Sequence, residues 1–419
     1  MTLPQKWSKI ALLNFTVLAA MGMLLRYKIL FPLPLVDHKH LLHGHSHFAF
    51  AGWVSLALYI GIIHILQPDE SLTKQFKQIL CTQLLSSYGM LLTFPFMGYA
   101  TLSIAFSTLS IFVSWWFGVV AWKALTKNRL LTFEKKWFYT ALVFNILSAL
   151  GTFSLAYLMA NKIIYQNWYF GSVYFYLHFQ YNGWFLFAIM GLLFSSQKRW
   201  FNDLQIINSN RFYVLMTTAA IPSLFLSMMW MRLPAWMHFA ANAAAFVQLF
   251  AAALFISLIL QVRKTVALSP HVKWILLIAL SAFSLKIILQ ALSAIPELNK
   301  YAFGIRPVVI GFLHLVLLVF VSFFIISYLL QNNLIIIETK TAKVGLWTFI
   351  TAALINEFVL MMQGISAIRY TNSVYSNELL LGAAIMMFTG LVLLTVTQKK
   401  GRVCSKNGIH ENLSSDILP

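Results

Sequence analysis

Charged residues are scarce in this sequence. Only 10% of the 419 residues are Asp, Glu, Lys or Arg, against about 25% in a typical soluble domain, and the mean hydropathy is +0.77. This shortage excludes a soluble globular protein. The two cysteines, Cys81 and Cys404, are too few and too far apart for a disulfide framework or a CxxC metal site. No HExxH, GxSxG or paired-carboxylate pattern occurs, so a hydrolytic enzyme has no support.

Acidic residues are rarer still, at 11 against 30 Lys and Arg, and the formal net charge is +19. Nucleic-acid binding would need the basic residues clustered on one polar face, whereas here they lie between apolar runs. The positive charge is therefore attributed to the topology of the chain, that is, to basic residues in the segments between apolar runs. No nucleic-acid partner is expected. The first apolar run lacks a small-residue cleavage site, so we expect a retained helix and not a signal peptide.

Long apolar runs are what the sequence has in abundance. Twelve of them reach the roughly 20 residues that cross a bilayer, which predicts an all-α polytopic membrane protein. The predicted spans are 8–30, 44–66, 77–98, 101–124, 137–160, 170–195, 211–232, 236–261, 273–295, 306–331, 344–366 and 377–398. Two boundaries are soft, one at the Pro95–Gly98 turn and one at Leu233-Pro234, which leaves eleven or thirteen spans open.

Basic residues fix the predicted orientation. The amino terminus, the tail and the loops on the same side hold 21 of the 30 Lys and Arg, the opposite loops hold 8, and Lys286 lies inside a span. Basic residues favour the cytoplasmic side. We therefore expect both termini in the cytoplasm, a plasma (inner) membrane location, one membrane domain over 1–400, and a polar, disordered cytoplasmic tail over 401–419.

Histidine is the most informative residue type in the runs. Five of the eleven histidines fall within residues 38–47 and lead into HGHSHFAFAGW at 43–53. Later ones open even-numbered runs, in LHFQYNGWF at 177–185, MHFAANAAAF at 237–246 and GFLHLVLLVF at 311–320. Every even run crosses from the outer face inward, so all these histidines are predicted at the outer face. The candidate ligands are His43, His45, His47, His178, His238 and His314.

Predicted depth singles out three of them. His47, His178 and His314 lie about 10 Å into their helices at 1.5 Å per residue. His43 and His47 share a helix face while His45 points elsewhere, so His47 is the expected deep ligand of its cluster. Imidazole binds heme iron, copper and non-heme iron. We expect a heme or metal site at the outer face; the alternative is a set of histidines that hydrogen-bond between helices.

With these motifs the chain resembles the heme-copper oxidase superfamily, the catalytic subunits of oxygen reductases and nitric oxide reductases. The resemblance covers nearly the whole chain: twelve helices, inward termini, a histidine before a small and aromatic run on the second helix, and histidines on the sixth and tenth. It implies that His47 and His314 are the axial ligands of a low-spin heme, of b type. It also implies that His178 binds copper or non-heme iron.

The sequence departs from that pattern in two places. The family carries a histidine pair on its seventh helix, where 211–232 contains none, and two heme-ligating histidines on its tenth, where only His314 occurs. The binuclear reaction centre is therefore in doubt. His238 is an extra histidine on the eighth helix. Together with His178, His43 and His45, it is a candidate metal ligand.

Three functions remain open at this point. The first is a redox enzyme that takes electrons from a quinol or a cytochrome and reduces a small diatomic gas, with a binuclear site that can be degenerate. The second is a non-catalytic heme protein for electron transfer or gas sensing. The third is a proton-coupled metal or heme transporter.

Four charged residues complete the predicted site. Arg306 and Arg369 lie at the outer face, where guanidinium groups could neutralise heme propionates or simply anchor the interface. Lys286 and Glu357 lie well inside apolar runs, where a charge costs several kcal/mol unless it is paired. They are expected to face the bundle interior, either as part of a proton path or as a Lys286–Glu357 bridge.

Overall fold

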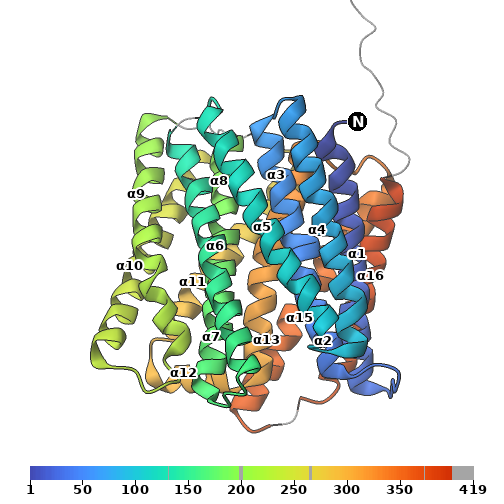
Figure 1. The fold of residues 1–419 in the computed structure, drawn as a ribbon, viewed down its shortest axis with the longest axis vertical. Coiled ribbons are helices and arrows are strands. Elements are labelled where there is room, and N and C mark those ends of the chain that lie inside the picture. The colour runs from blue at the N-terminus through green and yellow to red at the C-terminus, as the bar shows by residue number, and fades with distance from the viewer. Residues whose placement is uncertain (131, 198–201, 264–266, 372, 399–419) are drawn as a thin grey trace, which may run out of the picture.

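The computed structural model describes residues 1–130, 132–197, 202–263, 267–371 and 373–398, and within them it is a bundle of helices (Figure 1). The predicted tail over 401–419 lies outside the described residues. The α-helices are Leu3–Leu30 (α1), His38–Phe48 (α2), Leu56–Leu66 (α3), Glu70–Met97 (α4), Thr101–Lys127 (α5), Thr132–Ala160 (α6), Gln166–His178 (α7), Leu186–Gln197 (α8), Asp203–Ala220 (α9), Ala235–Val262 (α10), Pro270–Leu292 (α11), Pro296–Gly304 (α12), Arg306–His314 (α13), Phe323–Gln331 (α14), Lys340–Ile368 (α15) and Ser376–Thr397 (α16).

Ten helices within the described residues are long and apolar enough to cross a membrane. An eleventh span forms if α9 and the short 3-10 helix η4 (Pro222–Met228) are taken together, with a bend of 50° between them. The predicted span over 211–232 corresponds to the second part of α9 together with η4, with the bend between them. Pro222 has no amide hydrogen to continue the helical ladder, so α9 ends at Ala220.

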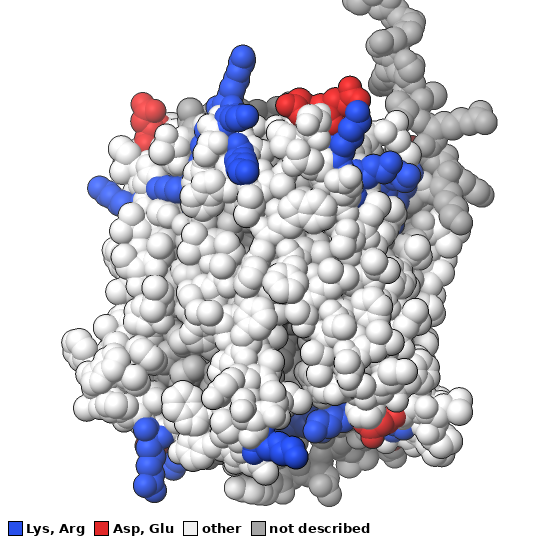
Figure 2. Space-filling model, in the orientation of Figure 1, with Lys and Arg blue, Asp and Glu red and all other residues white. Residues whose placement is uncertain are grey.

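Charge and exposure agree with a membrane-spanning protein. In Figure 2 the Lys, Arg, Asp and Glu side chains lie at the two ends of the bundle, and a broad band of other residues separates them. Large apolar side chains on the outside of the bundle are exposed, among them Phe239 at 78%, Phe246 at 72% and Leu92 at 65%. Such a surface is stable against lipid and not against water.

The two described ends of the chain lie at the same end of the bundle. Lys9 Nζ in α1 donates to the carbonyl oxygen of Gln398, just after α16, at 2.7 Å. The N-terminus lies at the opposite end from α2 and α12 (Figure 1). The end of the bundle at which α2, α7 and α13 begin is called the histidine end below.

Three long helical stretches share an unusual backbone feature. A π-helical segment interrupts each of them: η1 (Ala49–Ser55) between α2 and α3, η2 (Phe179–Phe185) between α7 and α8, and η5 (Leu315–Ser322) between α13 and α14. Each segment follows a histidine, with only Phe48 between His47 and η1. Because π-helical turns are rare and occur mostly at functional sites, they mark these three spans as special.

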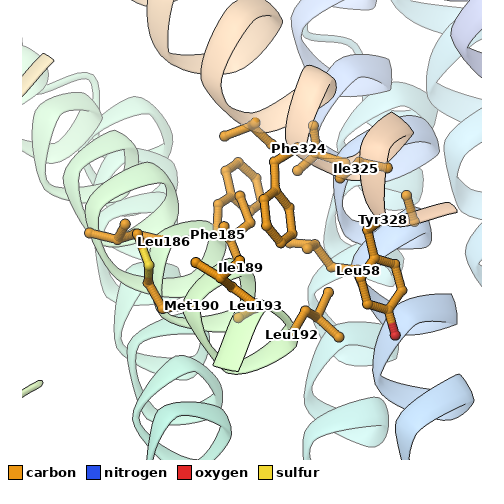
Figure 3. Packing of buried hydrophobic residues seen from close by; sticks show 14 of the residues in the cluster. Leu58, Phe185, Leu186, Ile189, Met190, Leu192, Leu193, Phe324, Ile325 and Tyr328 are labelled. Atoms are coloured by element: carbon orange, nitrogen blue, oxygen red, sulfur yellow. The ribbon is translucent and has the colours of Figure 1, made fainter. Parts of the chain in front are cut away.

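Beyond the π segments, the same spans meet in the centre of the bundle. Figure 3 shows Leu58 of α3, Ile189 and Leu192 of α8, and Phe324 of α14 packed together. A Cβ at Gly61 would lie only 2.8 Å from Leu192 Cδ1, so α3 and α8 approach closely because position 61 has no side chain. At the histidine end the spans pack on outer helices instead: α2 on α4, α7 on α6 and α13 on α15.

Candidate functional site

His314 is the last residue of α13. Its Nδ1 lies 2.9 Å from the carbonyl oxygen of Ile310. A carbonyl oxygen can only accept, so Nδ1 carries the proton, and Nε2 of the neutral ring has a free lone pair. No hydrogen bond to Nε2 is found within the described residues. A backbone carbonyl that orients the ring from behind in this way is typical of metal-bound histidines.

His45 lies on the side of α2 that is turned toward α1. Its ring approaches the Leu18 carbonyl, and a Cβ at Gly22 would lie 3.4 Å from its Cε1. Its Nδ1 is buried without a hydrogen-bond partner in the described part of the chain. The His314 imidazole and the Arg26 guanidinium both contribute to its electrostatic surroundings. His45 and His314 thus interact electrostatically, and no hydrogen bond within the described residues uses His45 Nδ1 or His314 Nε2.

The His45–His314 pair lies in a loosely packed part of the bundle. Both side chains lie deep in the protein and still retain accessible surface. None of the nine residues of α13 is fully buried, although the helix packs on α15. A Cβ at Gly311 would meet only the Cβ of Leu360, at 3.6 Å. Two unused imidazole nitrogens beside a loosely packed helix fit a planar group such as a heme.

Charged groups gather around this pair. The Arg26 guanidinium interacts electrostatically with Glu357 and Arg306. It also interacts electrostatically with the His45 and His314 rings. Arg306 begins α13, at the histidine end where it was predicted. Guanidinium groups bind carboxylates through paired hydrogen bonds, so Arg26 and Arg306 suit the acidic groups of a heme.

Sequence reasoning missed Arg26. Its place within an apolar helix, one turn before Leu30, is the signal that the sequence offers for it. The other predicted propionate partner, Arg369, is exposed at the C-terminal end of α15. No contact within the described residues places it beside the His45–His314 pair.

His47 and His43 lie on a different side of α2. The His47 ring stacks on Phe94 at a centroid distance of 4.4 Å and an interplanar angle of 6°, and its Nε2 is 3.4 Å from Tyr99 Oη. The His43 ring packs against Tyr99 at 4.7 Å. Residues two apart point about 200° away from each other on an α-helix. The geometry therefore favours His45 over the expected His47 as the partner of His314.

His178 belongs to a closed hydrogen-bond network. Its Nε2 donates to the Ala220 carbonyl at 2.8 Å, and its Nδ1 accepts from Asn182 Nδ2 at 3.1 Å. Asn182 Oδ1 in turn accepts from Lys286 Nζ. Both ring nitrogens are thus occupied by protein groups, which is the arrangement of a structural histidine and leaves no lone pair for a metal.

The candidate metal ligands do not form one cluster. Within the described residues no group of three or more His, Cys, Asp or Glu side chains is close enough to hold a metal ion. His238 lines a separate cavity, and His43 lies against α4. The four candidate histidines lie at the same end of the bundle but face different neighbours.

Lys286 and Glu357 do not pair with each other. Lys286 is only 2% exposed and donates to Asn182, so it faces the interior as predicted. Glu357 Oε1 accepts a hydrogen bond from Asn356 Nδ2 at 3.2 Å, and the charged group that interacts electrostatically with the Glu357 carboxyl is Arg26. The alternative of a Lys286–Glu357 bridge is not realised, because the two side chains bond to different partners.

Comparison with known proteins adds no family to these observations, since neither a protein-family model nor a curated protein matches the chain.

Proposed function

We propose that this protein is a membrane electron-transfer protein that holds one low-spin heme of b type between α2 and α13. The observation that carries the proposal is His314. Its Nδ1 is fixed on the Ile310 carbonyl, its Nε2 is unused, and its ring interacts electrostatically with that of His45, whose Nδ1 also makes no hydrogen bond within the described residues. Neutral imidazoles with a free lone pair are the form that binds heme iron.

The residues around the pair have distinct roles in this proposal. His45 and His314 hold the iron, and Arg26 and Arg306 bind the acidic side groups. Gly311 leaves α13 without a side chain where the macrocycle would lie, and Gly22 lets the His45 ring lie against α1. A heme held by two histidines exchanges one electron at a time and leaves no open coordination position. The Glu357 carboxyl interacts electrostatically with Arg26 and partly offsets the positive charge of the site.

Reduction of a gas is the less favoured candidate. It needs a second metal centre with its own ligands, and the hydrogen bonds of His178 use both of its ring nitrogens. The heme-copper oxidase resemblance would then reflect a relative that keeps the low-spin heme site alone. The electron donor would be a quinol or a cytochrome. Transport of a metal or heme remains the alternative if the protein carries no heme.

The topology that goes with this function has twelve spans. To the ten long helices and the bent α9–η4 pair we add α7, η2 and α8, which continue without a break from Gln166 to Gln197. The predominance of basic residues in the loops beside the N-terminus supports a cytoplasmic location for that end, and the contact of Lys9 with Gln398 supports the same location for the end of α16. The heme then lies toward the outer face of the inner membrane.

The test is the visible spectrum of the protein purified from cells supplied with a heme precursor. We expect one low-spin heme per chain and no spectral change with carbon monoxide. Replacement His314→Ala should abolish the low-spin bands, whereas His178→Phe should leave them unchanged. A colourless protein would overturn the proposal and favour transport, and carbon monoxide binding would restore the gas-reducing alternative.

A further inference from the structure

A cavity of about 1150 Å³ opens at the histidine end of the bundle, between α7, α10, α11, α12 and the segment that follows η4. Its lining residues are distinct from the His45–His314 pair. Three of them, Phe246, Ile288 and Leu292, are apolar and 72%, 45% and 42% exposed. They lie on α10 and α11, which are long and apolar enough to span the membrane. The cavity is therefore open to lipid.

Polar and apolar lining residues are separated by depth along α10. The helix begins at Ala235, and His238 and Asn242 lie within about 10 Å of that end at 1.5 Å per residue. Phe246 and Leu249 lie roughly 15 to 20 Å from it. The lining thus changes from polar to apolar toward the middle of the membrane, in the same order as one leaflet of a bilayer. A ligand with a polar head and an apolar tail fits this order.

Four aromatic rings line the same cavity. Phe170 lies 6.0 Å from Trp230 and Tyr174 lies 5.5 Å from Phe303, between centroids, and the rings of each pair stand at 85° to each other. Rings set at nearly right angles present walls on several sides, as in the aromatic cages that bind ammonium groups. Within the described residues no Lys or Arg is found over any of these four faces. The rings can therefore receive a cationic group from a ligand.

The polar side chains of the cavity offer both acceptors and donors. Asn242 Nδ2 donates to the His238 carbonyl at 2.9 Å, and Asn299 Nδ2 to the Ser293 carbonyl at 3.0 Å. Each amide oxygen is left without a donor from the described residues, and each amide keeps a second N–H. Lys300 is the one Lys or Arg, and no Asp or Glu from the described part of the chain lines the cavity.

These groups suit a head that carries both charges. The ring faces and the amide oxygens attract a primary ammonium group, and Lys300 and the amide N–H groups attract a phosphate. A head with negative charge alone would leave the ring faces and the amide oxygens unused. We propose that the cavity binds a zwitterionic aminophospholipid, with its ammonium group between Tyr174 and Trp230 and its phosphate at Lys300.

The size and the opening of the cavity agree with a lipid of this class. Ordinary ligand pockets measure roughly 300–1,000 Å³, so this cavity has room for the head and the first part of the chains. The acyl chains run from the polar end past Phe246 and Ile288 into the bilayer. The inference goes beyond the proposed heme and does not rest on it, because the heme ligands are not among the lining residues.

Native mass spectrometry of the protein in detergent tests the proposal with two matched probes. The first is dioleoyl phosphatidylethanolamine. The second is its N-acetyl derivative, which keeps the phosphate and both chains and lacks the positive charge. We expect the first to bind about tenfold more tightly, because only its ammonium group is attracted by the rings and amide oxygens. Equal binding of the two lipids by the unmodified protein would overturn the proposal without any variant.

Variants separate the two parts of the head. Trp230→Leu removes a ring face and should reduce the preference from about tenfold to about twofold. Trp168→Leu is the matched control, because Trp168 is 64% exposed on α7 and lies outside the lining. Lys300→Gln should weaken both probes alike, since both carry the phosphate. A Trp230→Leu protein that keeps the full preference would overturn the ammonium site, and unchanged binding of both probes to Lys300→Gln would overturn the phosphate site.

Two further measurements separate this lipid from a free headgroup and from the heme. Glycerophosphoethanolamine has the same head without chains and should not displace the lipid at equal concentration; displacement would overturn a lipid site. The His314→Ala protein should keep the tenfold preference. A protein without heme that still prefers the ethanolamine lipid would therefore retain this inference and refute the proposed heme, and a heme protein without the preference would do the reverse.

Discussion

The two halves of the histidine-bearing spans differ sharply in packing. Eight of the nine residues of α14 and nine of the eleven of α3 are buried. In the other halves of the same spans, α13 has no buried residue among nine, and α2 has three among eleven. The π-helical segments η1 and η5 lie at the transition. One half is a tightly packed apolar core, and the other carries the histidines and the interior space.

This difference separates stability from function within a single helix. The packed half holds the spans at fixed distances, as interdigitated interiors do. The loose half can then keep unused imidazole nitrogens and unfilled space, which cost stability and are tolerated where a ligand binds. Substitutions in the packed half should therefore affect folding, and substitutions at the histidine end should affect ligands.

The largest effect on stability is expected at the transition between the halves. Asn182→Leu removes the group that joins Lys286 Nζ to His178 Nδ1, and both would be left buried without their partner. The unmet polar groups should lower the free energy of unfolding by about 3 kcal/mol. Thermal unfolding in detergent measures this, with Asn161→Leu as the exposed control. An unchanged melting temperature would show that water replaces the Asn182 amide.

Substitutions at two glycines compare the packing of the two halves directly. Gly61→Val puts a side chain where even a Cβ lies 2.8 Å from Leu192 Cδ1, and overpacking should cost about 1–3 kcal/mol. Gly311→Ala, at the loose end, meets only the Leu360 Cβ at 3.6 Å and should be close to neutral for the heme-free protein. The melting temperatures of the two variants measure the two losses of stability. Equal losses would contradict the proposed difference in packing.

A smaller effect is expected just inside the packed half. Trp53 Nε1 donates to Ser322 Oγ at 2.9 Å and joins η1 to η5. Ser322→Ala leaves this buried indole N–H without a partner and should cost about 1–2 kcal/mol. The same change at Ser110, whose hydroxyl bonds only within its own helix, serves as the reference. If both variants unfold alike, the Trp53 bond does not contribute to holding the two spans together.

The smallest effect concerns the start of α2. Asp37 caps this helix, and the His40 backbone amide donates to its carboxylate at 3.0 Å, which lowers the Asp37 pKa. The stabilisation is therefore present above the usual carboxyl pKa and is lost as the pH falls through the lowered value. Asp37→Asn keeps a capping side chain and should remove this acid dependence, while Asp37→Ala should fray the helix at every pH. Hydrogen exchange of residues 38–41 would measure both.

Much of the fold follows from local sequence, whereas the histidine pairing does not. Apolar length is a local property, so the span over 306–331 was predicted at its observed ends. The start of α2 at His38 also had a local signal, the N-cap residue Asp37. Which side of α2 faces α13 depends on where the neighbouring helices stand. Depth alone therefore favours His47, whereas in the structure it is the His45 ring that interacts electrostatically with His314.

The most direct test of the account compares two alanine variants on one helix. His45→Ala should lose the low-spin heme spectrum, because it removes one of the two nitrogens proposed to hold the iron. His47→Ala should keep both heme content and spectrum, since its ring stacks on Phe94 and lies apart from His314. The reverse result, with heme lost in His47→Ala and retained in His45→Ala, would contradict the proposed site.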